Sequence, residues 1–115
     1  MINVNREVRN ILKAVEGVKI VYYHPDEYNK FPIISHYELT TTTGMRYDNA
    51  EQAQKTYVSV DVWGKSADEC TDFAIKADKL MQDAGWYREF SMDLPPKNKI
   101  YHKSTRFFKA IFFEI

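Results

Sequence analysis

The residues of this 115-residue chain whose types could do chemistry are Asp61, three histidines and a single cysteine. Asp61 lies in the alternating stretch YVSVDVWGKSADE, at residues 57–69. A general base or metal ligand at this position would need a second carboxylate or a histidine with suitable geometry. No D-x-D, H-x-H or E-x-K spacing accompanies it. We therefore interpret Asp61 as an exposed polar residue of a strand and not as a catalytic group.

A second cluster of possible ligands is His24, Asp26 and Glu27. These residues lie in a segment bounded by two prolines, a pattern that indicates a loop. The spacing is not that of a zinc or calcium site, so solvated loop charge is the better interpretation. The sequence therefore predicts no metal site here.

The other reactive side chains stand alone. His36 and His102 are isolated on predicted strands, where a histidine is more often satisfied or exposed than a ligand. Cys70 lies on the apolar stripe of a predicted helix, which favours a buried thiol over a nucleophile. Four glycines in total leave no glycine-rich phosphate loop. We expect no catalytic residue, cofactor or enzymatic activity, although a small hydrolase in which Asp61, His24 and Glu27 converge stays an alternative.

Composition narrows the class of protein. The length predicts one domain over residues 1–115. Lys plus Arg equals Asp plus Glu at sixteen each, which argues against long-range electrostatic capture of nucleic acid. One cysteine excludes an intrachain disulfide and fits a reducing cytoplasm. We expect no membrane span, because no apolar run approaches twenty residues, and no signal peptide at the N-terminus.

Hydrophobic periodicity predicts the elements that must position these side chains. Helices are expected at 4–16 and 66–84, strands at 18–23, 33–43, 56–63, 86–94 and 100–115, a polar connection at 44–55 and a turn at 95–99. The pattern predicts an α+β domain: a single antiparallel or mixed sheet of about five strands with two helices packed on one face.

The helix at 66–84 has the clearest signals. Ser66 and Glu69 have the capping-box spacing, and Gly85 stands where a left-handed residue ends a helix. Its apolar stripe, which we expect against the sheet, includes Phe73, Ala77, Leu80 and Met81.

The last strand has two apolar faces, of which one can contact the helices. Small Ala110 lies between two Phe on the even face, so we expect Phe108, Ala110 and Phe112 in the core. The odd face would then be an exposed apolar patch of the kind that marks an interface. The predicted subunit interface is Phe107, Lys109, Ile111, Phe113 and Ile115.

Two further expectations concern the odd face of the last strand: the partner of Lys109 and the way in which this face is covered. Lys109 in its middle would need an acidic partner, for which Asp61 or Glu38 of an adjacent subunit or strand is a candidate. Alternatively, a bend or the N-terminal helix covers this face within the chain.

The layout resembles the tail terminator, or tail-completion, proteins of long-tailed bacteriophages. The resemblance covers nearly the whole chain: an N-terminal helix, a strand, the strand FPIISHYEL, an irregular loop, the strand YVSVDVWGKSADE running into the helix CTDFAIKADKLM, and two closing strands. In that family the joint between this strand and helix is structural, which implies a structural role for Asp61. Related neck proteins share this kind of fold.

The resemblance implies a homo-oligomeric, hexameric ring at the head-proximal end of the tail tube in the virion, assembled in the cytoplasm of a bacterial host. Such a ring ends tube polymerisation and joins the tail tube protein to the head connector or stopper protein. DNA would pass through without specific binding, which the neutral net charge also favours. No cofactor and no catalysis are implied.

The connection at 44–55 is where we expect a contact with the tube. It is polar and longer than a hairpin requires, and family loops of this kind project toward the tube. The predicted contact residues are Met45, Arg46, Tyr47 and Asp48. Another neck or head–tail connector protein, or a monomeric or dimeric regulatory binding module, stays an alternative function.

Overall fold

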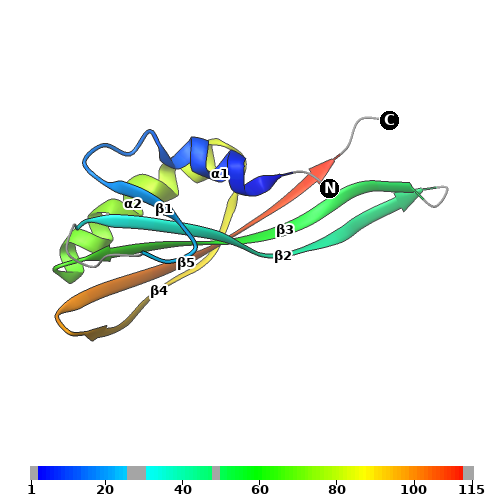
Figure 1. Cartoon of the computed structure of the whole chain (residues 1–115). Helices are drawn as coiled ribbons and strands as arrows, with labels where there is room; N and C mark the ends of the chain where they lie inside the picture. Colours follow the sequence, from blue (N-terminus) through cyan, green and yellow to red (C-terminus); the bar gives the residue numbers. More distant parts are fainter. Residues whose placement is uncertain (1–2, 26–30, 48–49, 113–115) are drawn as a thin grey trace.

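The computed structural model describes residues 3–25, 31–47 and 50–112, and within it one sheet carries two helices on one face (Figure 1). The elements are α1 (Val4–Leu12), β1 (Lys19–Tyr22), β2 (Ile33–Tyr47), β3 (Ala50–Gly64), α2 (Ala67–Asp83), β4 (Tyr87–Lys97) and β5 (Ile100–Phe112). The strand order is β1-β2-β3-β5-β4, with β1 parallel to β2 and the other neighbours antiparallel. This confirms the predicted α+β fold with a mixed five-stranded sheet.

The core lies between the helices and the face of the sheet that we call the inner face. Val58, Val60 and Val62 of β3 point to this face, as their alternation predicts, and each is buried. Ala77 and Met81 of α2 are buried against them, and α1 adds Val4, Val8 and Leu12. Phe73 and Leu80 are partly buried against the same core, so the predicted stripe of α2 is confirmed.

Local chemistry sets the start of both helices and the end of α2, whereas α1 ends at Leu12, earlier than the predicted residue 16. The Asn3 side chain accepts a hydrogen bond from the backbone N–H of Arg6, and the Ser66 hydroxyl accepts one from the N–H of Glu69. The Glu69 carboxylate accepts from the N–H of Lys65, so the capping box is only half formed. Gly85 follows α2 with φ +94°, a conformation that glycine adopts without strain.

The hairpin of β2 and β3 corrects the prediction for residues 44–55. The backbone continues as paired strands to Tyr47 and Ala50, and the pairing contains three register irregularities. The predicted tube-contact residues Met45, Arg46 and Tyr47 therefore belong to β2, while Asp48 lies outside the described residues. Residues 44–55, GMRYDNAEQAQK, are mostly polar or small, and they give none of the apolar alternation by which strands are recognised in a sequence.

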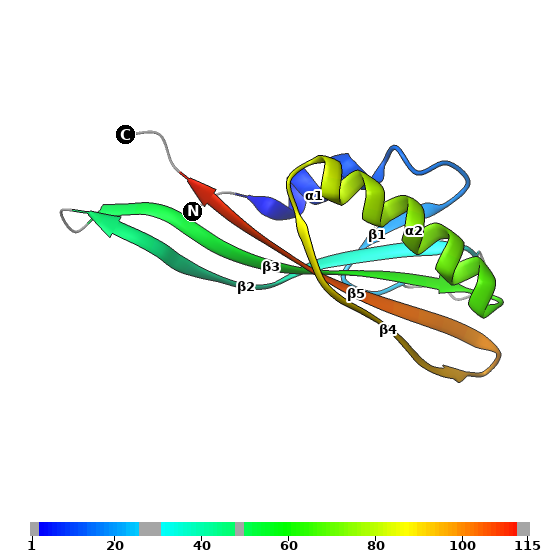
Figure 2. The same cartoon turned by 180° about the vertical axis from the view of Figure 1, so that it is seen from behind.

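The hairpin projects beyond the helices as an arm, which we define as residues 40–47 of β2, 50–57 of β3 and 109–112 of β5 (Figures 1 and 2). The molecule measures 53 × 25 × 22 Å, with a radius of gyration of 15.2 Å. A compact domain of this length would have a radius of gyration of about 13 Å. The arm accounts for this elongation.

The end of β4 also differs from the prediction. Pro95 and Pro96, expected in the turn, belong to β4, an outermost strand whose outer edge needs no backbone N–H donor. The turn itself is Asn98 and Lys99, both with positive φ, as a two-residue hairpin connection requires.

The prediction for the two faces of β5 is wrong. Phe107 is fully buried in the core, and Ile111 packs against the same core. Ala110 is exposed and Phe112 is 69% exposed on the opposite face, which we call the outer face. Register explains the reversal, because Phe107 pairs with Val58 and side chains of paired residues point to the same side. Of the predicted interface residues, Phe113 and Ile115 lie outside the described part of the chain.

Lys109, on the inner face, finds its partners within the same chain. Its Nζ lies 2.9 Å from Oε1 of Glu7 and donates to the carbonyl oxygen of Ala84 at 3.1 Å. The ammonium also lies 5.5 Å from the centre of the Trp86 ring. A cation beside the last carbonyls of α2 is electrostatically favourable. The expected acidic partners, Asp61 or Glu38, are therefore replaced by Glu7 of α1.

Candidate functional site

The outer face carries no helix, yet its centre contains buried polar side chains. Four cross-strand rows can be followed from β2 through β3 and β5 to β4. The row that contains Asp61 is polar: Ser35, Asp61 and Ser104, followed by Met92 on β4. Asp61 is 4% exposed, so its expected exposure is wrong. The surrounding rows supply aromatic rings that cover this polar centre.

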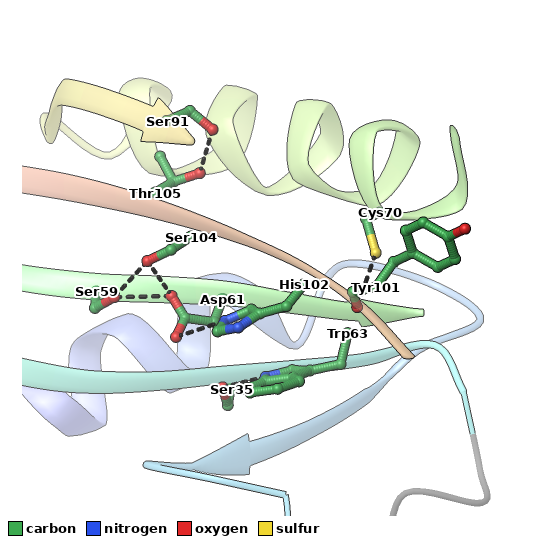
Figure 3. A network of polar contacts seen from close by, with 10 residues as sticks. All are labelled: Ser35, Ser59, Asp61, Trp63, Cys70, Ser91, Tyr101, His102, Ser104 and Thr105. Carbon is green, nitrogen blue, oxygen red and sulfur yellow. Dashed lines mark hydrogen bonds and ion pairs between the residues drawn. The ribbon is translucent and has the colours of Figure 1, made fainter. Parts of the chain in front are cut away.

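The carboxylate of Asp61 is the hub of the polar centre (Figure 3). Ser59 and Ser104 both donate to its Oδ1, at 2.8 and 2.7 Å. Its Oδ2 lies 3.1 Å from Nε2 of His102, close enough for an ion pair when the ring is protonated. The contact does not have the alignment of a hydrogen bond, so its strength depends on the ring's charge.

Stacked rings close this site from solvent. Trp63 stacks on His102 with ring centres 3.6 Å apart, and its indole N–H donates to Ser35 at 2.9 Å (Figure 3). The chain after β1 folds against the same face, where the His24 ring lies 5.9 Å from that of Trp63. The structure therefore places His24 against Trp63 on the same face as Asp61, but no contact joins His24 to the Asp61 carboxylate among the described residues, and Glu27 lies outside them.

The hydrogen-bond directions in this network differ from those of a Ser-His-Asp triad. In a triad the serine gives its proton to the histidine, and the histidine is oriented by the carboxylate. Here Ser59 and Ser104 direct their protons to Asp61 itself. The arrangement joins β2, β3 and β5 through their side chains.

Cys70 lies beside this network, at the start of α2. A pocket of about 150 Å³ is lined by both Cys70 and His102. The Cys70 thiol donates to the carbonyl oxygen of Tyr101 at 3.4 Å, and burial raises its pKa to about 11. A thiol held in its protonated form is a poor nucleophile. The predicted buried thiol is confirmed.

The remaining predicted histidine, His36, lies on the inner face, away from Asp61. It pairs with Val60 and is 1% exposed beneath the helix layer. Across the described ranges, no group of three His, Cys, Asp or Glu side chains could hold a metal ion. None of the described helices has the length and apolar character to cross a bilayer.

Around the polar centre the outer face exposes large apolar groups. Tyr57, Phe108 and Tyr87 form one row, with the Tyr57 and Phe108 rings 5.0 Å apart. Tyr87 is 74% exposed, and Phe90, Met92 and Phe112 are exposed as well. Arg106 lies over the Phe90 ring at 4.9 Å, which leaves a mixed aromatic and basic surface.

Sequence reasoning missed these features for a definite reason. The alternation of β3 did indicate that Ser59, Asp61 and Trp63 share a face. Their partners, Ser104 and His102, lie about forty residues away, and only the β3–β5 register brings them together. Comparison of the chain with models of known protein families and with curated proteins gives no match.

Proposed function

We propose that this protein is a ring-forming assembly subunit of a phage, prophage or tail-like particle. In this proposal the ring sits at the head-proximal end of the tail tube, ends tube polymerisation and joins the tail to the head connector. A neck or connector protein of similar fold is the nearest alternative. The predicted order of helices and strands on which the resemblance rests agrees with the fold described above.

The observation that carries the proposal is the helix-free outer face together with the unpaired strand edges of the arm (Figure 1). Two strand edges of the arm have no strand neighbour among the described residues: β2 beyond His36, where its pairing with β1 ends, and β5 beyond Phe108, where β4 begins. Open edges and exposed rings are features that soluble monomers avoid, because they promote association with other chains. In a closed assembly, neighbouring subunits can cover both the open strand edges and the exposed aromatic side chains.

The correction to β5 moves the proposed interface to the outer face. Phe107 and Ile111 serve the core of the chain itself, so they are not available to a neighbour. The exposed groups that replace them are Tyr87, Phe90 and Phe112. Burying a side chain of this size contributes roughly 1.5–3 kcal/mol. Contact between this face and a different face of the next copy is heterologous, and a ring results when the rotation closes.

The polar network around Asp61 supports assembly more than catalysis. Its carboxylate is already desolvated and hydrogen-bonded inside one chain. A neighbour that docks on the outer face therefore does not have to strip water from this charge, and the cost of desolvating an ion is avoided.

The test is the native mass of the purified protein, measured by light scattering and native mass spectrometry, with electron micrographs of the same sample. A particle of six times the 13.6 kDa chain mass, seen as a ring, is the expected result. A monomer at all concentrations would contradict the proposal.

A pair of variants locates the interface. Phe112→Asp places a charge on the outer face, and Ile75→Asp makes the same kind of change on α2, where Ile75 is 62% exposed. We expect Phe112→Asp to give a folded monomer and Ile75→Asp to leave the ring intact. If the outcomes are exchanged, the interface lies on the helix side.

A further inference from the structure

A pocket of about 250 Å³ lies between the first two turns of α1 and the strands β1 and β2, on the side of the molecule away from the outer-face network. It is lined by Asn3, Asn5, Arg6, Arg9, Tyr22 and His36. Two arginines and two amides around one small volume form a concentration of hydrogen-bond donors. The lining has no acidic residue to neutralise the arginines.

Two residues of this pocket have buried polar atoms without a hydrogen-bond partner within the described part of the chain. His36 is 1% exposed, and neither of its ring nitrogens has a hydrogen-bond partner there. The side-chain oxygen of Asn5 is buried without a partner too. Buried polar groups are nearly always hydrogen-bonded, and an unsatisfied one costs about 1–3 kcal/mol. Several in one pocket indicate that something binds there.

The charge state of the pocket selects the ligand. Burial and then the charge of Arg9 lower the pKa of His36 to about 4, so the ring is neutral at pH 7. A neutral imidazole has one nitrogen that donates and one that accepts. The Asn5 amide can present either its oxygen or its NH₂ group after a flip. A ligand for these groups must carry negative charge and offer both acceptors and a donor.

We propose that this pocket binds a phosphate group. Phosphate is an anion whose oxygens accept from planar guanidinium groups, and in its hydrogen-phosphate form it also donates an O–H. A carboxylate offers acceptors only. The N-terminal turn of α1, whose backbone N–H groups favour anions, adds to the same field. The half-exposed ring of Tyr22 at the pocket wall leaves space for an organic substituent on the phosphate.

The test is a titration of the isotope-labelled protein with inorganic phosphate at pH 7.5, followed by NMR on the Asn5 amide and the His36 ring. The matched variants are Arg9→Gln, which lines the pocket, and Lys13→Gln, which removes the same charge at the end of α1 outside the lining. Loss of one charged hydrogen-bond donor should weaken binding by about tenfold or more. Lys13→Gln should bind as the unaltered protein does.

Two outcomes of this titration would contradict the proposed phosphate site. If no saturable shift appears up to about 10 mM phosphate, well above the concentration that fills a millimolar site, the pocket is not a phosphate site. If both variants weaken binding equally, the effect is general attraction to a positive helix, and the proposal is wrong. Both substitutions replace exposed side chains, and circular dichroism will verify that the variants are folded.

Two further ligands distinguish the source of the phosphate. Phenyl phosphate carries a ring that can contact Tyr22, and it is compared with inorganic phosphate at about pH 5.5, where both ligands keep an O–H proton and His36 is still neutral. Acetate carries a single charge without a donor. Tighter binding of phenyl phosphate than of inorganic phosphate, lost in Tyr22→Ala, assigns the site to an organic phosphate. Equal binding of the two assigns it to free phosphate. Acetate that binds as tightly as phosphate would overturn the choice of ligand.

Discussion

Truncation of Phe107 is the sharpest test of how the two faces of β5 are assigned. Phe107 and Phe112 are the same residue type on the same strand, and their exposures are 1% and 69%. Phe107 lies opposite Val58 within the core, so Phe107→Ala removes a ring and leaves a cavity. Substitutions of this kind cost about 3–5 kcal/mol. Phe112→Ala removes a ring that is mostly in water, and it should change stability by no more than about 0.5 kcal/mol.

These magnitudes are large enough to measure on a small domain. For a chain of this length, 1 kcal/mol shifts the melting temperature by about 4 °C, so Phe107→Ala should lower it by roughly 12–20 °C. Urea unfolding followed by circular dichroism gives the free energy of unfolding directly. Measurements in dilute protein separate folding from any association of chains. Equal destabilisation by the two variants, or a larger effect of Phe112→Ala, would refute the assignment of the inner face.

Three further predictions concern the titratable side chains. Asp61→Asn should lower the free energy of unfolding by about 1–3 kcal/mol, because an amide cannot accept from both serines and balance His102 as the carboxylate does; unchanged urea unfolding would contradict this. Cys70 should resist a thiol reagent at pH 8 in the folded protein and react rapidly in urea, since burial raises its pKa to about 11; fast labelling without denaturant would contradict its burial. The pKa of His36 is lowered to about 4 in the folded protein, below the unfolded value near 6.5. Between pH 6.5 and pH 4 the unfolded chain therefore binds a proton at His36 that the folded chain does not, so the free energy of unfolding should fall as the pH drops through this range. NMR titration of the His36 ring measures the pKa, and a value near 6.5 would contradict the prediction.

The parts of the fold that the sequence predicts correctly are those with strong local signals. The capped helix at α2, the stop at Gly85 and the valine face of β3 each depend on residues within about one element. Periodicity reports which side of an element is buried when the other side is polar. It therefore works for α2 and β3, whose two sides differ.

The same reasoning fails where both sides of a strand are alike. In the C-terminal half of β5, each face carries two large apolar residues, Phe107 and Ile111 on one and Phe108 and Phe112 on the other, so composition cannot decide which face meets the helices. The register with β3 decides it, because Phe107 lies opposite Val58. Lys109 appeared unfit for the core because its partner, Glu7, is 102 residues away. Contacts of such long separation are invisible in a local pattern.

The arm was missed for a related reason. Its strands gain their order from pairing with each other, and Thr41 and Thr56 hydrogen-bond across the pair at 3.2 Å. The buried side chains of the arm in β3 are small or polar, namely Ala53, Gln54 and Thr56, so the apolar period-2 signal disappears while the backbone ladder persists. The polar composition that predicted an irregular loop is the composition of a hairpin whose buried positions hold polar and small side chains.

The division between the two faces gives a reason for the buried network around Asp61. If a helix-free sheet face carried only apolar residues, it would associate with other chains without specificity. If it carried exposed charges, these charges would have to be desolvated on contact with a neighbour. Here the charge is satisfied internally by Ser59 and Ser104, and rings such as Tyr87 remain outside it. In the proposed oligomer, the binding energy would then come from the exposed aromatic side chains. The Asp61 network would keep β2, β3 and β5 in one register. Disrupting the network should therefore misalign the outer surface before it unfolds the chain, and Asp61→Asn should weaken assembly at concentrations where the monomer is still folded.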